Sequence, residues 1–179
     1  RNYTLLELPH DTDGGERDYA VTIVRNFLYS ALMVLLWKAL ESSSDTQLAG
    51  IAGRSLKETR YHLRHSRDWM VRMGDGTAES HRRAQAALDY LWPFTAEFWT
   101  RSAMEDAAVA RAQTVPMVSL RTEWTAIARD ALTDATLSQP TATTTGAASF
   151  GKTGSHTPHL THLLDEMQSL ARQHPQATW

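Results

Sequence analysis

The fold of this 179-residue chain is decided by one stretch, Lys57-Glu58-Thr59-Arg60-Tyr61-His62-Leu63-Arg64-His65-Ser66-Arg67-Asp68-Trp69. The stretch places the carboxylate of Glu58 four residues before the imidazole of His62. Residues four apart are neighbours on a helix surface. A Glu and a His that face into a helical bundle begin a carboxylate-bridged di-iron site, whose usual spacing is Glu-x-x-His. The spacing here is one residue longer, so the stretch predicts a bundle helix with an altered site.

Helical patterns continue on both sides of this stretch. Apolar residues recur at helical spacing and predict helices over residues 16–42, 46–73, 77–101 (kinked at Pro93), 119–138 and 157–173. We expect residues 102–118 to be a linker or short helix, residues 1–15 an irregular lead-in, and residues 139–155 an exposed loop. No strand pattern is evident. The sequence therefore predicts an all-α fold in a single domain, residues 1–179.

Composition excludes several classes of function. The net charge of −2 gives no electrostatic case for nucleic acid or for an anionic membrane. The absence of Cys excludes disulfides, iron–sulfur clusters and thiol catalysis, and fits a cytoplasmic protein. The longest apolar stretch, residues 27–40, is shorter than the roughly 20 residues of a membrane span and contains Lys38. We expect it to form a buried core helix.

Several motifs together resemble one family. They are the quoted stretch with Met73-Gly74-Asp75-Gly76-Thr77, then Leu91-Trp92-Pro93-Phe94-Thr95-Ala96-Glu97, then Gly151-Lys152-Thr153-Gly154-Ser155-His156-Thr157-Pro158-His159-Leu160, and Glu166-Met167-Gln168 with Trp179. They resemble the PaaC-type subunit of the bacterial phenylacetyl-CoA ring epoxidase. The resemblance implies a ferritin-like helical bundle without catalytic residues. It implies as partners a homologous catalytic di-iron subunit, other epoxidase subunits and a flavin and iron–sulfur reductase, with no cofactor in this chain.

The resemblance also bears on which part of the fold this chain represents. Residues 2–16 resemble an internal crossover of the family, so we expect the first two bundle helices to be missing and this chain to be the C-terminal part of the fold. The apolar run at residues 27–40 would then face water. Exposing several large aliphatic side chains would exceed the few kcal/mol by which a domain is stable. We therefore expect a homo-oligomer with an apolar interface centred on residues 23–40. Pro158 departs from the family, which commonly has Glu there.

The ligand count argues against a metal site in this chain. A di-iron bundle takes four carboxylates and two His from four helices. The helix at 16–42 has Ser30, Leu32 and Met33 at its middle and no carboxylate. The extra residue between Glu58 and His62 rotates the imidazole by about 100°. We expect Glu58 and His62 to be a relic of such a site, a buried and hydrogen-bonded polar pair in the bundle core.

The remaining candidates are interface or capping residues. They are Arg60, Arg64, Arg67, His156, His159 and Glu166. The arginines could contact an acidic partner or CoA phosphates, or could form a solvated helix face. The histidines, together with His162, could bind zinc, but their spacing favours capping and interface hydrogen bonds. Trp92, Phe94, Phe98 and Trp99 should pack a core or an interface.

The sequence thus leads to one main hypothesis and two alternatives. The main hypothesis is a structural, non-catalytic subunit of the multicomponent oxygenase that epoxidises phenylacetyl-CoA. The alternatives are a free-standing ferritin-like metal-binding oxidoreductase and an unrelated helical adaptor. The absent mid-helix carboxylate favours the first.

Overall fold

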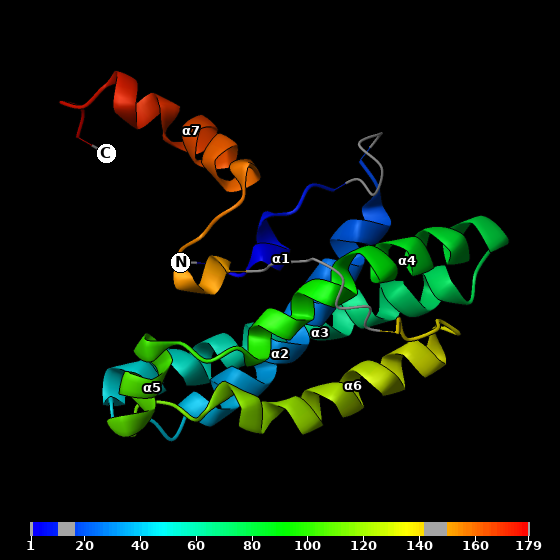
Figure 1. The fold of residues 1–179 in the computed structure, drawn as a ribbon, viewed down its shortest axis with the longest axis horizontal. Coiled ribbons are helices and arrows are strands. Elements are labelled where there is room, and N and C mark those ends of the chain that lie inside the picture. The colour runs from blue at the N-terminus through cyan, green and yellow to red at the C-terminus, as the bar shows by residue number, and fades with distance from the viewer. Residues whose placement is uncertain (1, 11–16, 142–149, 179) are drawn as a thin grey trace.

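The described part of the chain is mainly helical (Figure 1). The structure is a computed structural model and describes residues 2–10, 17–141 and 150–178; within these ranges it contains no strand. The α-helices are α1 (Thr4–Glu7), α2 (Tyr19–Leu40), α3 (Thr46–Gly74), α4 (Ala78–Leu91), α5 (Ala103–Ala110), α6 (Arg121–Asp134) and α7 (Pro158–Gln173). Three 3₁₀ helices cover Trp92–Trp99, Met117–Leu120 and Gly151–Thr153. The predicted all-α class is confirmed, and the predicted helix bounds agree to within a few residues for α2, α3 and α7.

Helix α2 is the centre of the core and packs against α3, α4 and α6. Phe27, Leu28 and Leu32 are fully buried. In length and hydropathy α2 would suit a membrane span, but 61% of its most apolar window is buried by the rest of the chain, as in a core helix of a globular protein. The expectation that residues 27–40 face water is therefore wrong for most of that run, because α3, α4 and α6 cover it. The oligomeric state that was argued from it stays a prediction.

Helix α3 begins where Asp45 accepts hydrogen bonds from the backbone N–H groups of Gln47 and Leu48. Asp is a favoured N-cap residue, because its carboxylate satisfies backbone N–H groups that have no partner within the helix. The inward face of α3 does not include His62, which was expected in the bundle core. The buried residues of α3 are Ala52, Leu56, Ser66, Met70 and Gly74. At Gly74 any Cβ would overlap the carbonyl of Ala135, so glycine allows the closest approach of α3 to the segment that follows α6.

The segment after α3 follows the capping and proline signals of the sequence. Thr77 and Ser80 form a capping box at the start of α4. The predicted kink at Pro93 is a change of helix type: α4 ends at Leu91 and a 3₁₀ helix continues to Trp99. An aromatic cluster of Trp92, Phe98 and Trp99 surrounds Trp124 of α6. The Trp124 indole N–H donates to the backbone oxygen of Leu28 at 3.1 Å, which ties α6 to α2.

Both ends of the chain differ from the sequence expectation. The lead-in contains α1, whose residues Thr4, Leu5 and Glu7 are buried; Arg25 holds it by donating to the backbone oxygens of Leu8 and Pro9 at 2.7 and 2.8 Å. Within the predicted exposed loop, Gly151 is buried at the start of a 3₁₀ helix. Residues 11–16 and 142–149 of these two segments, and Trp179, lie outside the described residues. Helix α7 extends away from the other helices and has no buried residue (Figure 1).

Candidate functional site

The most heavily bonded polar region joins the two ends of the chain. We call it the junction and define it as residues 150–157 with the carboxylates of Glu7, Glu97 and Glu105. The 3₁₀ helix after α4 carries Glu97, which is 2% exposed. Its carboxylate accepts from the backbone N–H of Thr4 at 2.8 Å and of Lys152 at 2.6 Å. One buried carboxylate thus fixes the lead-in and the C-terminal motif to the same point, which satisfies two backbone donors away from water.

Gly151 and Lys152 make the rest of this contact. The N–H of Gly151 donates to the Thr4 hydroxyl at 3.2 Å, and a Cβ at this position would overlap the carbonyl oxygen of Asn2. The Lys152 side chain is only 8% exposed and its ammonium lies 2.9 Å from Glu105. The ammonium also donates to the backbone oxygens of Thr100 and Phe98 at 2.5 and 3.3 Å. A buried charge needs partners of this kind, so Lys152 is a structural cation.

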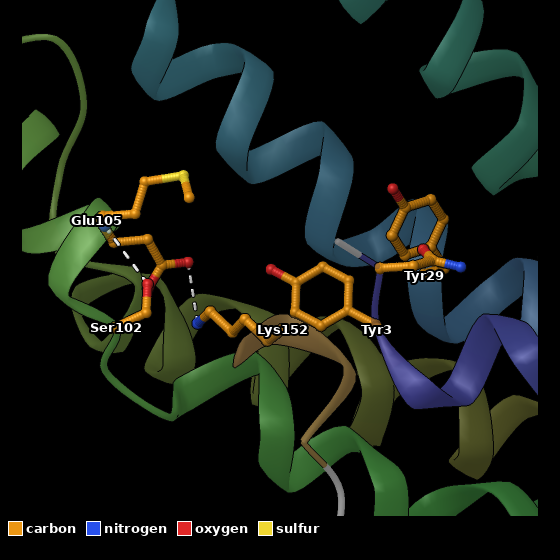
Figure 2. Close-up of a pocket in the computed structure, with 7 residues that line it drawn as sticks. Tyr3, Tyr29, Ser102, Glu105 and Lys152 are labelled. Carbon is orange, nitrogen blue, oxygen red and sulfur yellow. Dashed lines mark hydrogen bonds and ion pairs between the residues drawn. The ribbon is translucent and has the colours of Figure 1, made fainter. Parts of the chain in front are cut away.

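A pocket of about 240 Å³ opens beside this ion pair (Figure 2). It is lined by Asn2, Tyr3, Tyr29, Ser102, Met104, Glu105 and Lys152. Burial, followed by the nearby carboxylate of Glu105, raises the pKa of Tyr3 above its ordinary value of 10.0. Burial also raises the pKa of Tyr29. Both phenols therefore stay neutral hydrogen-bond donors across the physiological pH range.

The second carboxylate of the junction sets the start of α7. The Glu7 side chain is 0% exposed, and its Oε1 lies 2.6 Å from Nδ1 of His156. Its other oxygen accepts from the backbone N–H of Thr157 at 2.7 Å and from the Thr157 hydroxyl at 3.0 Å. Thr157 is the N-cap of α7, and Pro158 occupies the first helical position, which needs no N–H partner. Glu7 thus caps the N-terminus of α7 in place of a side chain from the helix itself.

The sequence analysis placed the Glu58–His62 pair in the bundle core, but in the structure the pair lies at the surface. The carboxylate and the imidazole are 3.7 Å apart, too far for a hydrogen bond, and their side chains are 78% and 47% exposed. The expectation of a buried, hydrogen-bonded pair in the bundle core is wrong for this structure, because no described segment covers this face of α2 and α3. His62 lines an open groove there, together with Asn26, Tyr29, Ser30, Met33, Trp37 and Thr59.

The arginines of α3 divide into two groups. Arg67 binds Asp130 and Asp134 of α6 at 2.9 and 2.6 Å, and the hydrogen bond to Asp130 is the main cause that raises its pKa. It therefore clamps two helices of the same chain, which is not the interface role considered from sequence. Arg64 lies over the Tyr61 ring at 5.8 Å. Arg60 is exposed.

Of the C-terminal candidates, only His156 reaches the body of the protein. It contacts Glu7, while His159 and Glu166 are exposed on α7. The Asp165–Arg172 pair at 2.7 Å lies on the same helix and is exposed. The structure therefore does not bring His156, His159 and His162 together with Glu166 as a metal site would require.

Of the residues that build the junction, the sequence analysis singled out His156 but missed the roles of Glu7, Glu97, Glu105 and Lys152. Glu7 lies 149 residues before His156, and Glu97 lies 55 residues before Lys152. Pairs so distant give no periodic signal. Two of the motifs quoted for the family resemblance do contain Glu97 and Lys152, and that co-occurrence was the available clue.

Among the described residues, no three His, Asp or Glu side chains converge in a way that could hold a metal ion. The Glu58–His62 pair offers two ligands at the surface, whereas a di-iron bundle requires four carboxylates and two His. The residues present therefore do not fit a di-iron centre, and no chemical step can be derived through one in this part of the chain.

Fold and site together define an all-α helical bundle protein, consistent with the ferritin-like class. The sequence model of the family described as "Phenylacetic acid catabolic protein" matches residues 1–179. The chain is 38% identical over 180 residues to the C subunit of the 1,2-phenylacetyl-CoA epoxidase of Escherichia coli (strain K12), covering 99% of this chain and 68% of that relative. The chain belongs to the phenylacetic acid catabolic protein family, and it is of the PaaC type.

Proposed function

We propose that this protein is a structural, non-catalytic subunit of a multicomponent oxygenase that epoxidises phenylacetyl-CoA. Its similarity, over almost its whole length, to one subunit of such an epoxidase is the observation that carries the proposal. The polar groups of the junction support a structural role, since each of Glu7, Glu97 and Lys152 is occupied in holding the chain together. The catalytic di-iron centre belongs to a homologous partner subunit, and electrons come from a flavin and iron–sulfur reductase.

The proposal has a consequence for where the chain contacts others. The open groove between α2 and α3 and the exposed helix α7 are two surfaces that the described residues leave uncovered. A subunit that supports another by contact would use surfaces of this kind. As a catabolic enzyme subunit without a disulfide, the protein would act in the cytoplasm. The homo-oligomer expected from sequence remains compatible with these surfaces.

The alternative of a free-standing metal-binding oxidoreductase needs a ligand set that the described residues do not offer. A helical adaptor unrelated to the epoxidase is disfavoured by the family match over residues 1–179. No feature of the junction or of the groove favours either alternative.

Reconstitution tests the proposed function. The purified chain is incubated with phenylacetyl-CoA, oxygen and an electron donor, alone and together with the di-iron subunit and reductase of the same source, and epoxide is measured by mass spectrometry. We expect no product from the chain alone and a rate with all components that exceeds the rate when the chain is omitted. Turnover by the chain alone, or no dependence on the chain, would contradict the proposal.

A further inference from the structure

A second pocket lies between α5 and the 3₁₀ helix Met117–Leu120, at the end of the bundle where Figure 1 shows α5. Its volume is about 400 Å³, compared with about 240 Å³ for the pocket beside Lys152. All of its lining comes from residues 99–118, and more than half of the lining residues are apolar. Small-molecule sites are mostly apolar cavities of about 300–1,000 Å³ that contain a few polar groups. The pocket has the size and the composition of such a site.

Helix α5 forms one wall of this pocket and is tied to the rest of the fold at both ends. At its first turn Glu105 pairs with the ammonium of Lys152 at 2.9 Å (Figure 2). After its last turn Ser44 donates from its backbone N–H to the oxygen of Ala112 at 3.0 Å and from its hydroxyl to the oxygen of Arg111 at 2.8 Å. No residue of α5 is buried, so its side chains do not fill the space beneath it. The pocket is therefore pre-formed, which lowers the cost of ordering a site on binding.

Two of the lining residues favour an aromatic ring over an aliphatic chain. Trp99 packs against Phe98 and Trp124, with ring centroids 5.9 and 5.5 Å apart, and its remaining surface lines the pocket. Met117 is 8% exposed and belongs to the hydrophobic core. An aromatic ring packs favourably against an indole and against a methionine sulfur, in addition to the area that it buries. An aliphatic group of the same size gains from the buried area alone.

The three charged residues that line the pocket are already paired within the chain. Arg101 lies 3.2 Å from Asp106, and Glu105 pairs with Lys152. A net charge on a ligand would therefore meet no unpaired opposite charge among the lining residues. The Arg101 side chain is 79% exposed, and a guanidinium has five N–H donors, so it can still donate to an uncharged oxygen. The charges of the pocket thus favour an uncharged polar group on the ligand.

The pocket is too small to receive a helix from another segment or another chain. One turn of an α-helix about 10 Å across occupies roughly 400 Å³, so a single turn would need the whole volume. The two bundle helices that the sequence analysis expects to be missing need a surface several turns long, such as the open groove between α2 and α3. No residue of α2 or α3 lines this pocket. Its dimensions suit a small molecule.

We propose that this pocket binds a compact aromatic molecule with an uncharged polar substituent, such as an amide or an ester. The ring lies against Trp99 and Met117, and an oxygen of the substituent accepts a hydrogen bond from Arg101. A cavity of about 150 Å³ already holds benzene, so the larger volume here also accommodates a substituent of a few atoms. The inference goes beyond the proposed function, because it assigns a binding site to this chain that requires no partner subunit.

The test uses NMR of the protein at the full length that its gene encodes, with ¹³C-labelled methionine methyl groups. Phenylacetamide carries the ring and an uncharged oxygen, phenylacetate carries the ring and a charge, and acetamide lacks the ring. We expect phenylacetamide to shift the Met117 signal with a dissociation constant on the order of 1 mM, and to leave the Met33 and Met167 signals in place. Phenylacetate should bind at least about fivefold more weakly, and acetamide should cause no shift.

Two substitutions on α5 locate the binding. Ala110→Trp places an indole in the pocket, whereas Ala103→Trp adds the same group to the same helix at a position that does not line it. Both alanines are exposed, so neither change disturbs the core, and circular dichroism confirms the helix content. We expect Ala110→Trp to weaken phenylacetamide binding by at least about tenfold and Ala103→Trp to bind within about twofold of the wild type.

Each other result overturns the inference. If phenylacetamide does not shift the Met117 signal, the pocket is not a site for this class of ligand, whether it stays empty or receives a side chain from upstream residues of the same protein. Equal binding by Ala110→Trp and the wild type, or equal loss in both variants, places the binding elsewhere. Tighter binding of phenylacetate than of phenylacetamide refutes the uncharged ligand. None of these measurements uses the di-iron subunit, so they leave the proposed function untouched.

Discussion

Glu7 and His156 are 149 residues apart in the chain, and their side chains meet at 2.6 Å. The same carboxylate accepts from the Thr157 N–H at 2.7 Å, so a residue of the first helix acts as the cap of the last one. A carboxylate at a helix N-terminus also interacts favourably with the helix dipole. The direction of α7 therefore depends on a residue that the sequence of α7 does not contain.

Replacement of Glu7 should loosen this connection. In Glu7→Gln an amide N–H₂ replaces one of the two carboxylate oxygens that accept these hydrogen bonds. The Thr157 N–H or the His156 ring would therefore lose its partner. Leaving a buried group unsatisfied costs about 1–3 kcal/mol. We expect a lower free energy of unfolding in urea and faster hydrogen exchange at residues 157–160. The matched control is Glu58→Gln, whose side chain is 78% exposed and which should change neither quantity. Equal effects of the two substitutions would contradict the capping role of Glu7.

Lys152 forms a buried ion pair, whereas Lys38 forms an exposed one. Lys152→Met removes a buried cation and leaves Glu105 and two backbone oxygens without their donor. Breaking a buried pair costs about 3–5 kcal/mol, and the lower end applies here because Glu105 is 29% exposed. Lys38→Met breaks a pair that is 3.7 Å long, with both side chains more than half exposed, and should cost less than about 1 kcal/mol. Urea unfolding of both variants measures the difference; a smaller loss in Lys152→Met than in Lys38→Met would show that the junction is not a stabilising element.

Much of the fold could be predicted from local sequence signals for helix starts. The predicted starts of α3, α4 and α7 agree with the structure to within one residue, because the capping and proline effects of Asp45, Thr77 and Pro158 act within one helical turn. His62 was expected in the bundle core from helical spacing, and spacing alone does not show which face of α3 other segments cover. In the described residues the face that carries His62 is open, and Ser66 and Met70 define the buried side.

The junction could not be predicted in the same way. Its bonds connect residues that lie between 47 positions (Glu105 and Lys152) and 150 positions (Glu7 and Thr157) apart, and such contacts follow from tertiary packing alone. The loop that contains Gly151 has a polar, small-residue composition that usually indicates exposure. What buries its end is the fit of a glycine against the carbonyl of Asn2, which composition does not reveal.

Two glycines of α3 should respond to alanine in opposite directions. At Gly74 a Cβ would overlap the Ala135 carbonyl, so Gly74→Ala must push two segments apart. Overpacking of this kind costs about 1–3 kcal/mol. At Gly50 no atom lies within 4 Å of the added Cβ, so Gly50→Ala should stabilise the helix by about 0.5–1 kcal/mol. Thermal unfolding gives the sign of each change directly. A stabilised Gly74→Ala would show that α3 and α6 do not approach as closely as described.

Metal analysis addresses the Glu58–His62 pair. Two exposed ligands 3.7 Å apart offer weak chelation, because stable transition-metal sites take three or more protein ligands. Protein expressed with added iron should therefore contain metal well below one equivalent. The double variant Glu58→Ala and His62→Ala should retain the same metal content and the same thermal midpoint. Stoichiometric iron that the double variant loses would revive the alternative of a metal-binding oxidoreductase.

The two phenols beside Lys152 make the free energy of unfolding depend on pH in the alkaline range. Burial is the main cause that raises the pKa of Tyr3, followed by the carboxylate of Glu105, and burial raises the pKa of Tyr29. Above pH 10 the unfolded chain loses these protons while the folded chain keeps them. The stabilising contribution is therefore complete below pH 10 and is lost as the pH rises through the folded-state pKa.

Tyr3→Phe isolates this effect. The variant removes one group that releases a proton on unfolding, and no hydrogen bond of the Tyr3 hydroxyl to the described residues is broken, so the stability at pH 7 should change little. The slope of the unfolding free energy against pH between pH 9.5 and 11 should become less steep than in the wild type. Tyr61→Phe is the matched control, since that ring is 56% exposed and its removal should leave the wild-type slope. Urea unfolding at several pH values measures all three proteins. An unchanged slope in Tyr3→Phe would mean that water reaches the Tyr3 phenol freely, and that the pocket beside Lys152 is more open than the structure describes.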